Sequence, residues 1–215
     1  MQTDHYQSGQ MGPGTIQEKS FAIIDTAVDL SPFPAEERVV VRRCTHAAGD
    51  FAIAKHICFS PGAVKTGIGL ARKRAPVFAD VRMVEAGISK ASLSRLSLSV
   101  HTYVDSVEAI ELAGEKGWTR SEAAVWLYRG IIDGGIAVIG NAPTALWKIL
   151  ELAEKGIARP GLVIGMPVGF VGAADSKEAL ASSDLPFVTC IGTRGGSPLA
   201  AAAFNAVLGL AVSGR

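Results

Sequence analysis

Residues 136–146 read IAVIGNAPTAL, and the order of residue types in this stretch decides the fold. Its first four residues form a purely apolar run rich in β-branched side chains, which is typical of a buried strand. Gly140 and Asn141 break the run, and a helical pattern follows over 144–154. A buried strand that leads through a short turn into a helix is the repeating unit of a parallel sheet.

The same alternation of apolar runs and helical stretches occurs on both sides of this unit. The connections are too long for hairpins, so we expect parallel strands covered by helices on both faces. The sequence therefore predicts an α/β fold, a three-layer α/β/α doubly wound five-stranded parallel sheet of flavodoxin-like architecture. The predicted strands are 76–81, 96–103, 136–139, 162–165 and 187–191, and the helices among them are 105–116, 119–132, 144–154, 174–182 and 198–212.

The part of the chain before the first strand has the signals of three helices. Thr15 and Glu18 have the spacing of a capping box, and Thr119 opens a second such box later in the chain. Pro34 and Gly49 suit the start and the end of a helix. The predicted helices are 15–28, 34–48 and one from 60 to the basic residues 72–74, whereas 50–59 fit no single period and are predicted as a turn or short helical piece.

The composition indicates one domain in a reducing, aqueous environment. With 215 residues, 48% of them hydrophobic, we expect a single domain over 15–215 after a mobile arm over 1–14. Lys and Arg total 21 against 20 Asp and Glu, and their scattering argues against a nucleic-acid partner. The three cysteines form no C-x-x-C pair, so neither disulfides nor zinc are expected. Without a leader or an apolar run of about 18 residues, a soluble, cytoplasmic protein with no membrane partner is expected.

The predicted helix over 34–48 carries the histidine best placed for chemistry. At about 100° per residue, Arg43 and His46 lie together at the edge of an apolar face. Imidazole titrates near neutral pH, so this pair suits a proton donor beside an anion-binding group at the rim of a cleft. A lone histidine at a helix edge is also common as packing, and these residues alone leave that alternative open. The face predicted to be buried consists of Val39, Val40, Cys44, Ala47 and Ala48.

Three glycine-containing loops are predicted to lie beyond the carboxyl ends of the strands, where doubly wound sheets bind ligands. They are 140–144, 165–177 and 192–197. Ordinary turns between strands and helices also contain glycine, so a purely structural role is the alternative. The side chains predicted to donate hydrogen bonds from these loops are Asn141, Thr144, Ser176, Lys177, Arg194 and Ser197.

Several kinds of active site have no support in the sequence. There is no G-x-x-x-x-G-K-[ST] phosphate loop, no G-x-S-x-G elbow, and no His-x-x-x-His or carboxylate cluster for a catalytic metal. His5, His56 and His101 have no neighbours that suggest chemistry. What remains is one imidazole among anion-binding groups, which favours a reaction that needs only a proton and a shaped pocket.

Taken in order, these stretches resemble the precorrin-8X methylmutase family of cobalamin biosynthesis. The resemblance covers nearly the whole predicted domain, and seven motifs in order make it specific. The motifs are SFAII at 20–24, R-x-x-H-A-x-G at 43–49, FSP at 59–61, D-x-x-MV-x-x-GI at 80–88, IGNAPTAL at 139–146, GMPVGFVGAADSK at 165–177 and G-x-x-GGS at 192–197.

This resemblance implies an isomerase, an intramolecular methyltransferase that moves a methyl group from C11 to C12 of precorrin-8X or of its cobalt form. The products are hydrogenobyrinate or cobyrinate, and neither a cofactor nor a metal is implied. The family's proton donor and acceptor falls on His46, and its substrate-contacting serine and arginine fall on Ser20 and Arg43. A homodimer with sites near the subunit boundary is also implied.

The corrinoid substrate carries many carboxylates, so we expect further anion-binding groups around it. No role is assigned to Asp50 or Asp80. The main alternative is a non-catalytic tetrapyrrole-binding carrier of the same fold, and a nucleotide or phosphoryl-transfer enzyme is a second alternative that lacks its motifs. The predicted substrate-binding residues besides Ser20 and Arg43 are Asn141, Thr144, Lys177, Arg194, Gly195, Gly196 and Ser197.

Overall fold

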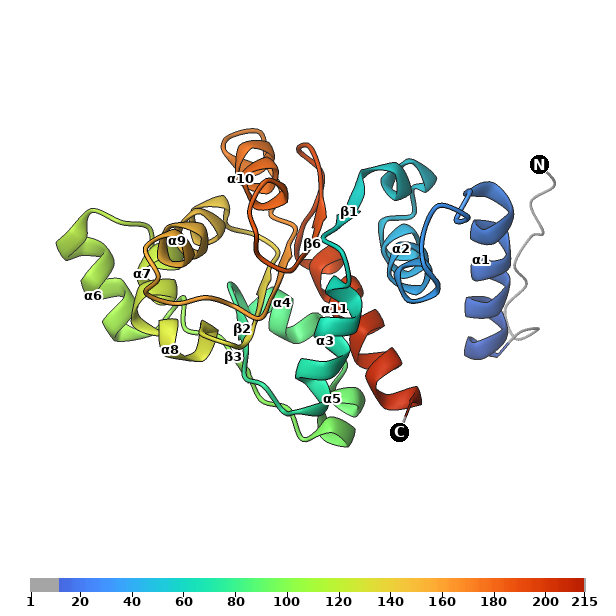
Figure 1. Ribbon diagram of the computed structural model, residues 1–215, viewed down its shortest axis with the longest axis horizontal. Coiled ribbons are helices and arrows are strands. Elements are labelled where there is room, and N and C mark those ends of the chain that lie inside the picture. The colour runs from blue at the N-terminus through green and yellow to red at the C-terminus, as the bar shows by residue number, and fades with distance from the viewer. Residues whose placement is uncertain (1–11, 215) are drawn as a thin grey trace.

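The computed structural model describes residues 12–214 and contains one sheet with helices on both faces (Figure 1). The strand order is β1-β6-β5-β4-β2-β3, and β2 to β6 run parallel to one another. All five predicted strands are present, which confirms the three-layer, doubly wound prediction. Their bounds are β2 Val77–Ala79, β3 Val100–His101, β4 Ile136–Ile139, β5 Leu162–Gly165 and β6 Phe187–Cys190.

The sheet has a sixth strand, so the predicted number of five was wrong. Residues 50–59 contain the 3₁₀ helix η1 Phe51–His56 followed by β1 Ile57–Phe59. β1 pairs antiparallel with β6, with Ile57 opposite Cys190. Three residues are too few to show a period of two, and their pairing partner is far away along the chain. The pattern of the segment itself therefore carries no signal of this strand.

Helices on the two faces of the sheet enclose two separate cores. In β4, Ile136 and Val138 face one core, and Ala137 and Ile139 face the other. Burial on both faces explains why this strand is a continuous apolar run. The first core is covered by α2 Ala35–Ala48, α3 Ala63–Arg72, α4 Arg82–Gly87, α5 Lys90–Leu96 and α11 Ser197–Ser213, and the second by α6 Val107–Lys116, α7 Arg120–Leu127, α8 Arg129–Ile132, α9 Pro143–Glu154 and α10 Ala173–Ala181.

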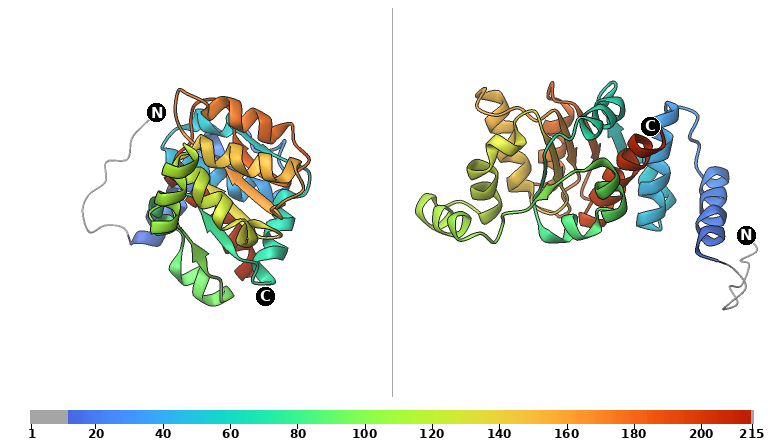
Figure 2. Two further views of the ribbon diagram at one scale, coloured as in Figure 1. Left: turned by 90° about the vertical axis from the view of Figure 1, so that its left-hand side faces the viewer. Right: turned by 90° about the horizontal axis from the view of Figure 1, so that it is seen from below.

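The helix α1 Pro13–Ala27 stands at one end of the molecule and packs on α2 (Figure 2). The capping box predicted at Thr15 is wrong, because the helix begins before Thr15 and has Gly12 as its N-cap without a side-chain cap. A residue inside a helix lacks the extended conformation that capping needs. Of the predicted arm over 1–14, residues 1–11 lie outside the described residues, while 13–14 belong to α1.

Local capping explains where other elements agree with or differ from the prediction. The capping box at Thr119 is confirmed, because its hydroxyl accepts the Glu122 N–H and the Glu122 carboxylate accepts the Thr119 N–H. The helix predicted over 119–132 is interrupted at Tyr128, which separates α7 from α8. The strand predicted over 96–103 is reduced to β3, because Ser89 caps α5 and that helix extends to Leu96.

The parallel strands direct four connections to one edge of the sheet. Asp80 follows β2, residues 140–142 follow β4, 166–172 follow β5 and 191–196 follow β6. This carboxyl edge is where doubly wound folds bind their ligands. No helix within residues 12–214 is long and apolar enough to span a membrane.

Burial against the sheet, rather than helix propensity, should dominate the stability of the fold. Ile149 of α9 is fully buried, whereas Ile110 of α6 is 47% exposed. We expect Ile149→Ala to lower the free energy of unfolding by about 2–5 kcal/mol, because it removes buried methyl groups and leaves a cavity. The matched change Ile110→Ala should cost less than about 1 kcal/mol. Urea denaturation measures both, and equal losses would contradict the assignment of the core.

Candidate active site

His46 and Arg43 lie on the same side of α2, facing α1, as their helical spacing predicts. The His46 ring meets the ring of Phe21 edge to face, with centroids 5.5 Å apart. The Arg43 guanidinium lies 5.2 Å from the centroid of the same ring. The imidazole is exposed and the arginine half-buried. One aromatic side chain from α1 therefore holds a titratable group and a cation side by side.

Ser20 reaches this neighbourhood through Phe21, which follows it on α1. Its hydroxyl is half-buried and donates to the carbonyl of Ile16, one turn earlier, at 2.9 Å. An ion pair between Arg42 and Asp25, with 2.7 Å between Nε and Oδ1, also joins α2 to α1. Arg43 and His46 thus share a contact with Phe21, and Ser20 is the residue before Phe21 on α1.

The buried face of α2 differs from the predicted one. Val40, Val41, Cys44 and Thr45 are buried, Val39 is half-buried, and Ala47 and Ala48 are exposed. The packing of α11 against α2 sets this face. The prediction that Ala47 and Ala48 are buried is therefore wrong, and both line a hollow instead.

That hollow lies between the end of α2 and the loop after β6, and has a volume of about 350 Å³. Asp50 and Arg194 stand at its margin and form an ion pair, with 2.7 Å between Nη1 and Oδ2. The other oxygen of Asp50 accepts the Ala52 N–H and caps η1. Both charged side chains are close to half exposed, so the pair itself adds little stability. Its effect is to hold the guanidinium of Arg194 beside Asp50 in the lining of the hollow.

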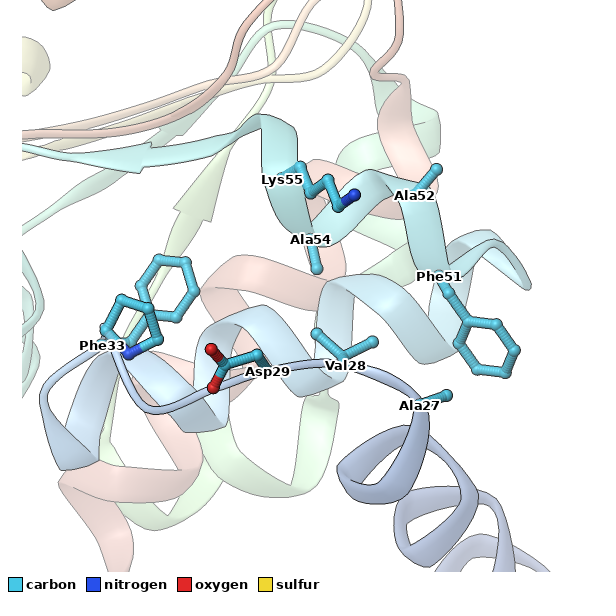
Figure 3. A pocket seen from close by; sticks show the side chains of 9 residues that line it. Ala27, Val28, Asp29, Phe33, Phe51, Ala52, Ala54 and Lys55 are labelled. Carbon is cyan, nitrogen blue, oxygen red and sulfur yellow. The ribbon is translucent and has the colours of Figure 1, made fainter.

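A larger hollow of about 500 Å³ lies on the other side of η1 (Figure 3). The segment between α1 and α2 forms one wall, with Val28 and Phe33, and η1 forms the other, with Phe51 and Ala54. The lining is mainly apolar. His46 is not among the residues that line either hollow, so the imidazole lies beside them rather than inside them.

The carboxylate of Asp80 holds the backbone of the loop after β4 by hydrogen bonds. Asp80 Oδ1 accepts the Gly140 N–H at 3.0 Å, and Oδ2 accepts the N–H groups of Asn141 and Ala142 at 2.8 Å each. Burial raises the pKa of Asp80 above its usual range, and these hydrogen bonds oppose that shift. These three amides are therefore not free for a ligand, because an internal carboxylate accepts from them. No role for Asp80 was predicted. Its position directly after the strand β2 was the feature of the sequence that could have indicated a role at the carboxyl edge.

The side chains of Asn141 and Thr144 differ in their exposure and in their hydrogen bonds. Asn141 is exposed, and its side chain makes no hydrogen bond to any other described residue. Thr144 is half-buried, and its hydroxyl is 2.9 Å from the hydroxyl of Thr119 at the start of α7. Only Asn141 therefore presents a polar side chain from this loop to solvent at the carboxyl edge.

Lys177 is fully buried and points inward. Its ammonium donates to the carbonyl of Arg194 at 2.5 Å, and burial lowers its pKa to about 8. The amide of Gly196 donates to the carbonyl of Met166 at 2.8 Å. A side chain at Gly195 would collide with the carbonyl oxygens of Met166 and Pro167.

Together these contacts show how the last loop is used. Lys177, Gly195 and Gly196 fix its backbone against the loop after β5, and Ser197 is buried at the start of α11. Of the predicted donors in this loop, only Arg194 has its side chain exposed. No group of three or more His, Cys, Asp or Glu that would hold a metal occurs within residues 12–214.

The fold defines an α/β protein with a doubly wound sheet, in which an imidazole and an arginine of α2 share a contact with Phe21 and a second arginine, Arg194, lines a hollow beside the end of α2. The family model of precorrin-8X methylmutase matches residues 15–210. The cobalt-precorrin-8 methylmutase of Priestia megaterium is 41% identical over 202 residues, which cover 94% of this chain and 90% of the relative. The precorrin-8X methylmutase of Pseudomonas aeruginosa is 39% identical over 206 residues, covering 95% and 97%.

A solved structure gives the same result. The precorrin-8X methylmutase from Thermus thermophilus superposes with a TM-score of 0.84 at 37% identity, covering 93% of this chain and 98% of the other. The chain belongs to the precorrin-8X methylmutase family, and it is an isomerase.

The buried ammonium of Lys177 should make stability depend on pH in a defined window. Its folded pKa of about 8 lies below the value of roughly 10.4 expected for an unfolded chain. Between these values the unfolded chain binds more protons, so this group's contribution to stability rises with pH. We expect Lys177→Met to lack that rise, so that its unfolding free energy falls relative to the wild type from pH 7 to pH 10.

Urea denaturation across this pH range measures the difference between the two proteins. Lys155→Met, at an exposed lysine, is the control for the loss of one positive charge. A difference between Lys177→Met and the wild type that stays constant with pH would contradict the assignment.

Proposed function

We propose that this chain moves a methyl group from C11 to C12 of precorrin-8X or of its cobalt form, and so produces hydrogenobyrinate or cobyrinate. The observation that carries the proposal is the exposed imidazole of His46 beside Arg43, both against Phe21, in a member of this family. The names of the relatives include both the metal-free and the cobalt substrate. The proposal therefore includes both forms.

His46 acts as the proton donor and acceptor in this proposal. Protonation of the conjugated ring develops positive charge, which draws the migrating methyl group to the neighbouring carbon, and the proton is then returned. Substrate and product are isomers, so the proposed reaction requires no redox partner and no external cofactor. A positioned acid contributes about 10²–10⁴-fold to such a step. Holding one face of the macrocycle against the imidazole supplies the orientation.

The carboxylates of the substrate meet a small set of cations and donors. Arg43 lies beside the imidazole, and Arg194 lines the smaller hollow. Ser20 and Asn141 add neutral donors on either side. Lys177, Gly195 and Gly196 contribute by fixing the backbone that carries Arg194. We propose direct contact with the substrate for the first four and a supporting role for the others.

We extend the proposal to a cytoplasmic homodimer with sites near the subunit boundary. Phe170 is 96% exposed and Val171 88% exposed, in the loop after β5 beside the smaller hollow. Apolar side chains this exposed favour burial against another protein surface. Neither hollow is large for a macrocycle with many carboxylate arms, since drug-sized ligands already occupy roughly 300–1,000 Å³. A second copy would complete the enclosure, and light scattering in solution tests its presence.

His46→Ala should abolish conversion while the product still binds. We expect turnover of precorrin-8X, followed by visible absorption, to fall by about 10²–10⁴-fold, because the acid is removed without touching the rest of the site. His101→Ala is the control, since that ring stacks on Tyr103 at the opposite end of the sheet.

Full turnover by His46→Ala would assign the acid to another residue. If the wild type binds the corrinoid but never converts it, the carrier alternative replaces the enzyme.

Arg194→Ala should weaken product binding more than it slows turnover. Arg194 lines the smaller hollow, whereas His46 does not, so we assign Arg194 to affinity rather than to proton transfer. We expect Kd to rise roughly tenfold, the range of one charge-assisted hydrogen bond. Arg159→Ala removes a similarly exposed ion pair, with Asp184, and is the matched control. Unchanged affinity in Arg194→Ala would exclude this arginine from the substrate site.

A further inference from the structure

The carboxylate of Asp80 is fully enclosed by the turn that follows β4. Only 1% of the residue is exposed, and its oxygens accept three consecutive backbone N–H groups from Gly140, Asn141 and Ala142. Three amides turned toward one carboxylate form the kind of concave nest that elsewhere binds an external anion. The negative charge also lies at the N-terminal end of α9, where the helix dipole favours it. The anion bound by the amides of this turn is therefore the carboxylate of Asp80, a side chain of the same protein.

The same turn is clamped from its other side by α11. A Cβ atom at Gly140 would lie 2.7 Å from the Cα atom of Ser197 and equally close to the Val84 side chain. The backbone between β4 and α9 is thus packed between the start of α11 and the carboxylate of Asp80. It has no room to shift while both contacts hold. A turn whose backbone is held on both sides fixes the direction of any side chain that it exposes to solvent.

The exposed side chain of the turn after β4 is that of Asn141. The amide N–H of Asn141 donates to Asp80 at 2.8 Å, while its side chain is exposed and makes no hydrogen bond to the rest of residues 12–214. We propose that Asp80 is a positioning residue of the methylmutase site, which directs Asn141 to the corrinoid by holding the backbone on both sides of it. Asp80 itself touches no substrate and transfers no proton. This inference rests on the proposed function.

A double-mutant cycle on product binding tests the inference. Asp80→Asn keeps the shape of the side chain but turns one acceptor into a donor that faces backbone N–H groups. We expect it to raise Kd for the product and KM for precorrin-8X roughly tenfold, with kcat changed far less. In the background of Asn141→Ala the same change should raise Kd by less than about twofold, because Asp80 acts only through Asn141.

This cycle separates positioning from a general loss of structure. If Asp80 only stabilised the fold, the effects of the two substitutions on affinity would be independent and would multiply, and that result would overturn the inference. Unchanged Kd and KM in Asp80→Asn would overturn it equally. Asp184→Asn, at an exposed carboxylate between α10 and β6, is the matched control and should leave both constants unchanged.

A second variant keeps the test decisive if Asp80→Asn does not fold. Asp80→Ser retains an acceptor with a smaller side chain and enters the same cycle with the same expectations. The wild type distinguishes the two proposals from each other. A wild type that does not convert precorrin-8X contradicts the proposed function, whereas a wild type that converts it while the cycle multiplies contradicts the role of Asp80 alone.

Discussion

Burial of both faces of the sheet is the constraint on which the rest of this structure depends. All four residues of β4 are completely buried, divided between two cores, and β5 is equally enclosed. Strands of this kind have no side chains left for chemistry, so only the segments beyond their ends can carry it. Parallel pairing then brings four such segments to a single edge. The position of the site thus follows from the way the core is built.

Gathering four loops at one edge concentrates backbone amides and charges there, and most of them are paired internally. Asp80 accepts from the turn after β4, Lys177 donates to the carbonyl of Arg194, and Asp50 pairs with the Arg194 side chain. A buried carboxylate or ammonium without partners would be costly. Among the groups left accessible are His46 and Arg43 against Phe21, the side chain of Arg194, and Asn141. In the proposed function, selectivity for an anionic substrate therefore depends on a few side chains whose supporting loops are held by internal hydrogen bonds and ion pairs.

The sequence predicts the parts of the structure that depend on local pattern. The predicted strands 136–139 and 162–165 have the same bounds as β4 and β5. A strand that is buried on both faces is apolar throughout, so the apolar run in the sequence begins and ends with the strand. β1 was not predicted, because three residues become a strand only through their pairing with β6. The face that α2 buries was predicted incorrectly at Ala47 and Ala48, because α11 decides it from a distant part of the chain.

The candidate site also has some features that follow from local sequence and others that follow only from packing. Arg43 and His46 are neighbours by helical spacing alone, so the sequence predicts their adjacency. Phe21 comes from another helix, and its contact with both rests on packing that no spacing reveals. Lys177 and Thr144 have the chemistry of ligand donors, yet their hydrogen bonds are used within the protein. Whether a polar side chain faces a ligand or its own backbone is a property of the fold.

The attachment of α1 has a consequence for the dynamics of the site. Among residues 14–27 only Ile24 is buried, and the helix rests on α2 through Phe21 and the Arg42 to Asp25 ion pair. A segment with so little buried apolar surface opens locally at a much lower free energy than the core strands. The structure therefore carries Ser20 and Phe21 on a helix that is weakly attached to the core. One wall of the site is able to fray and re-form while the sheet stays folded.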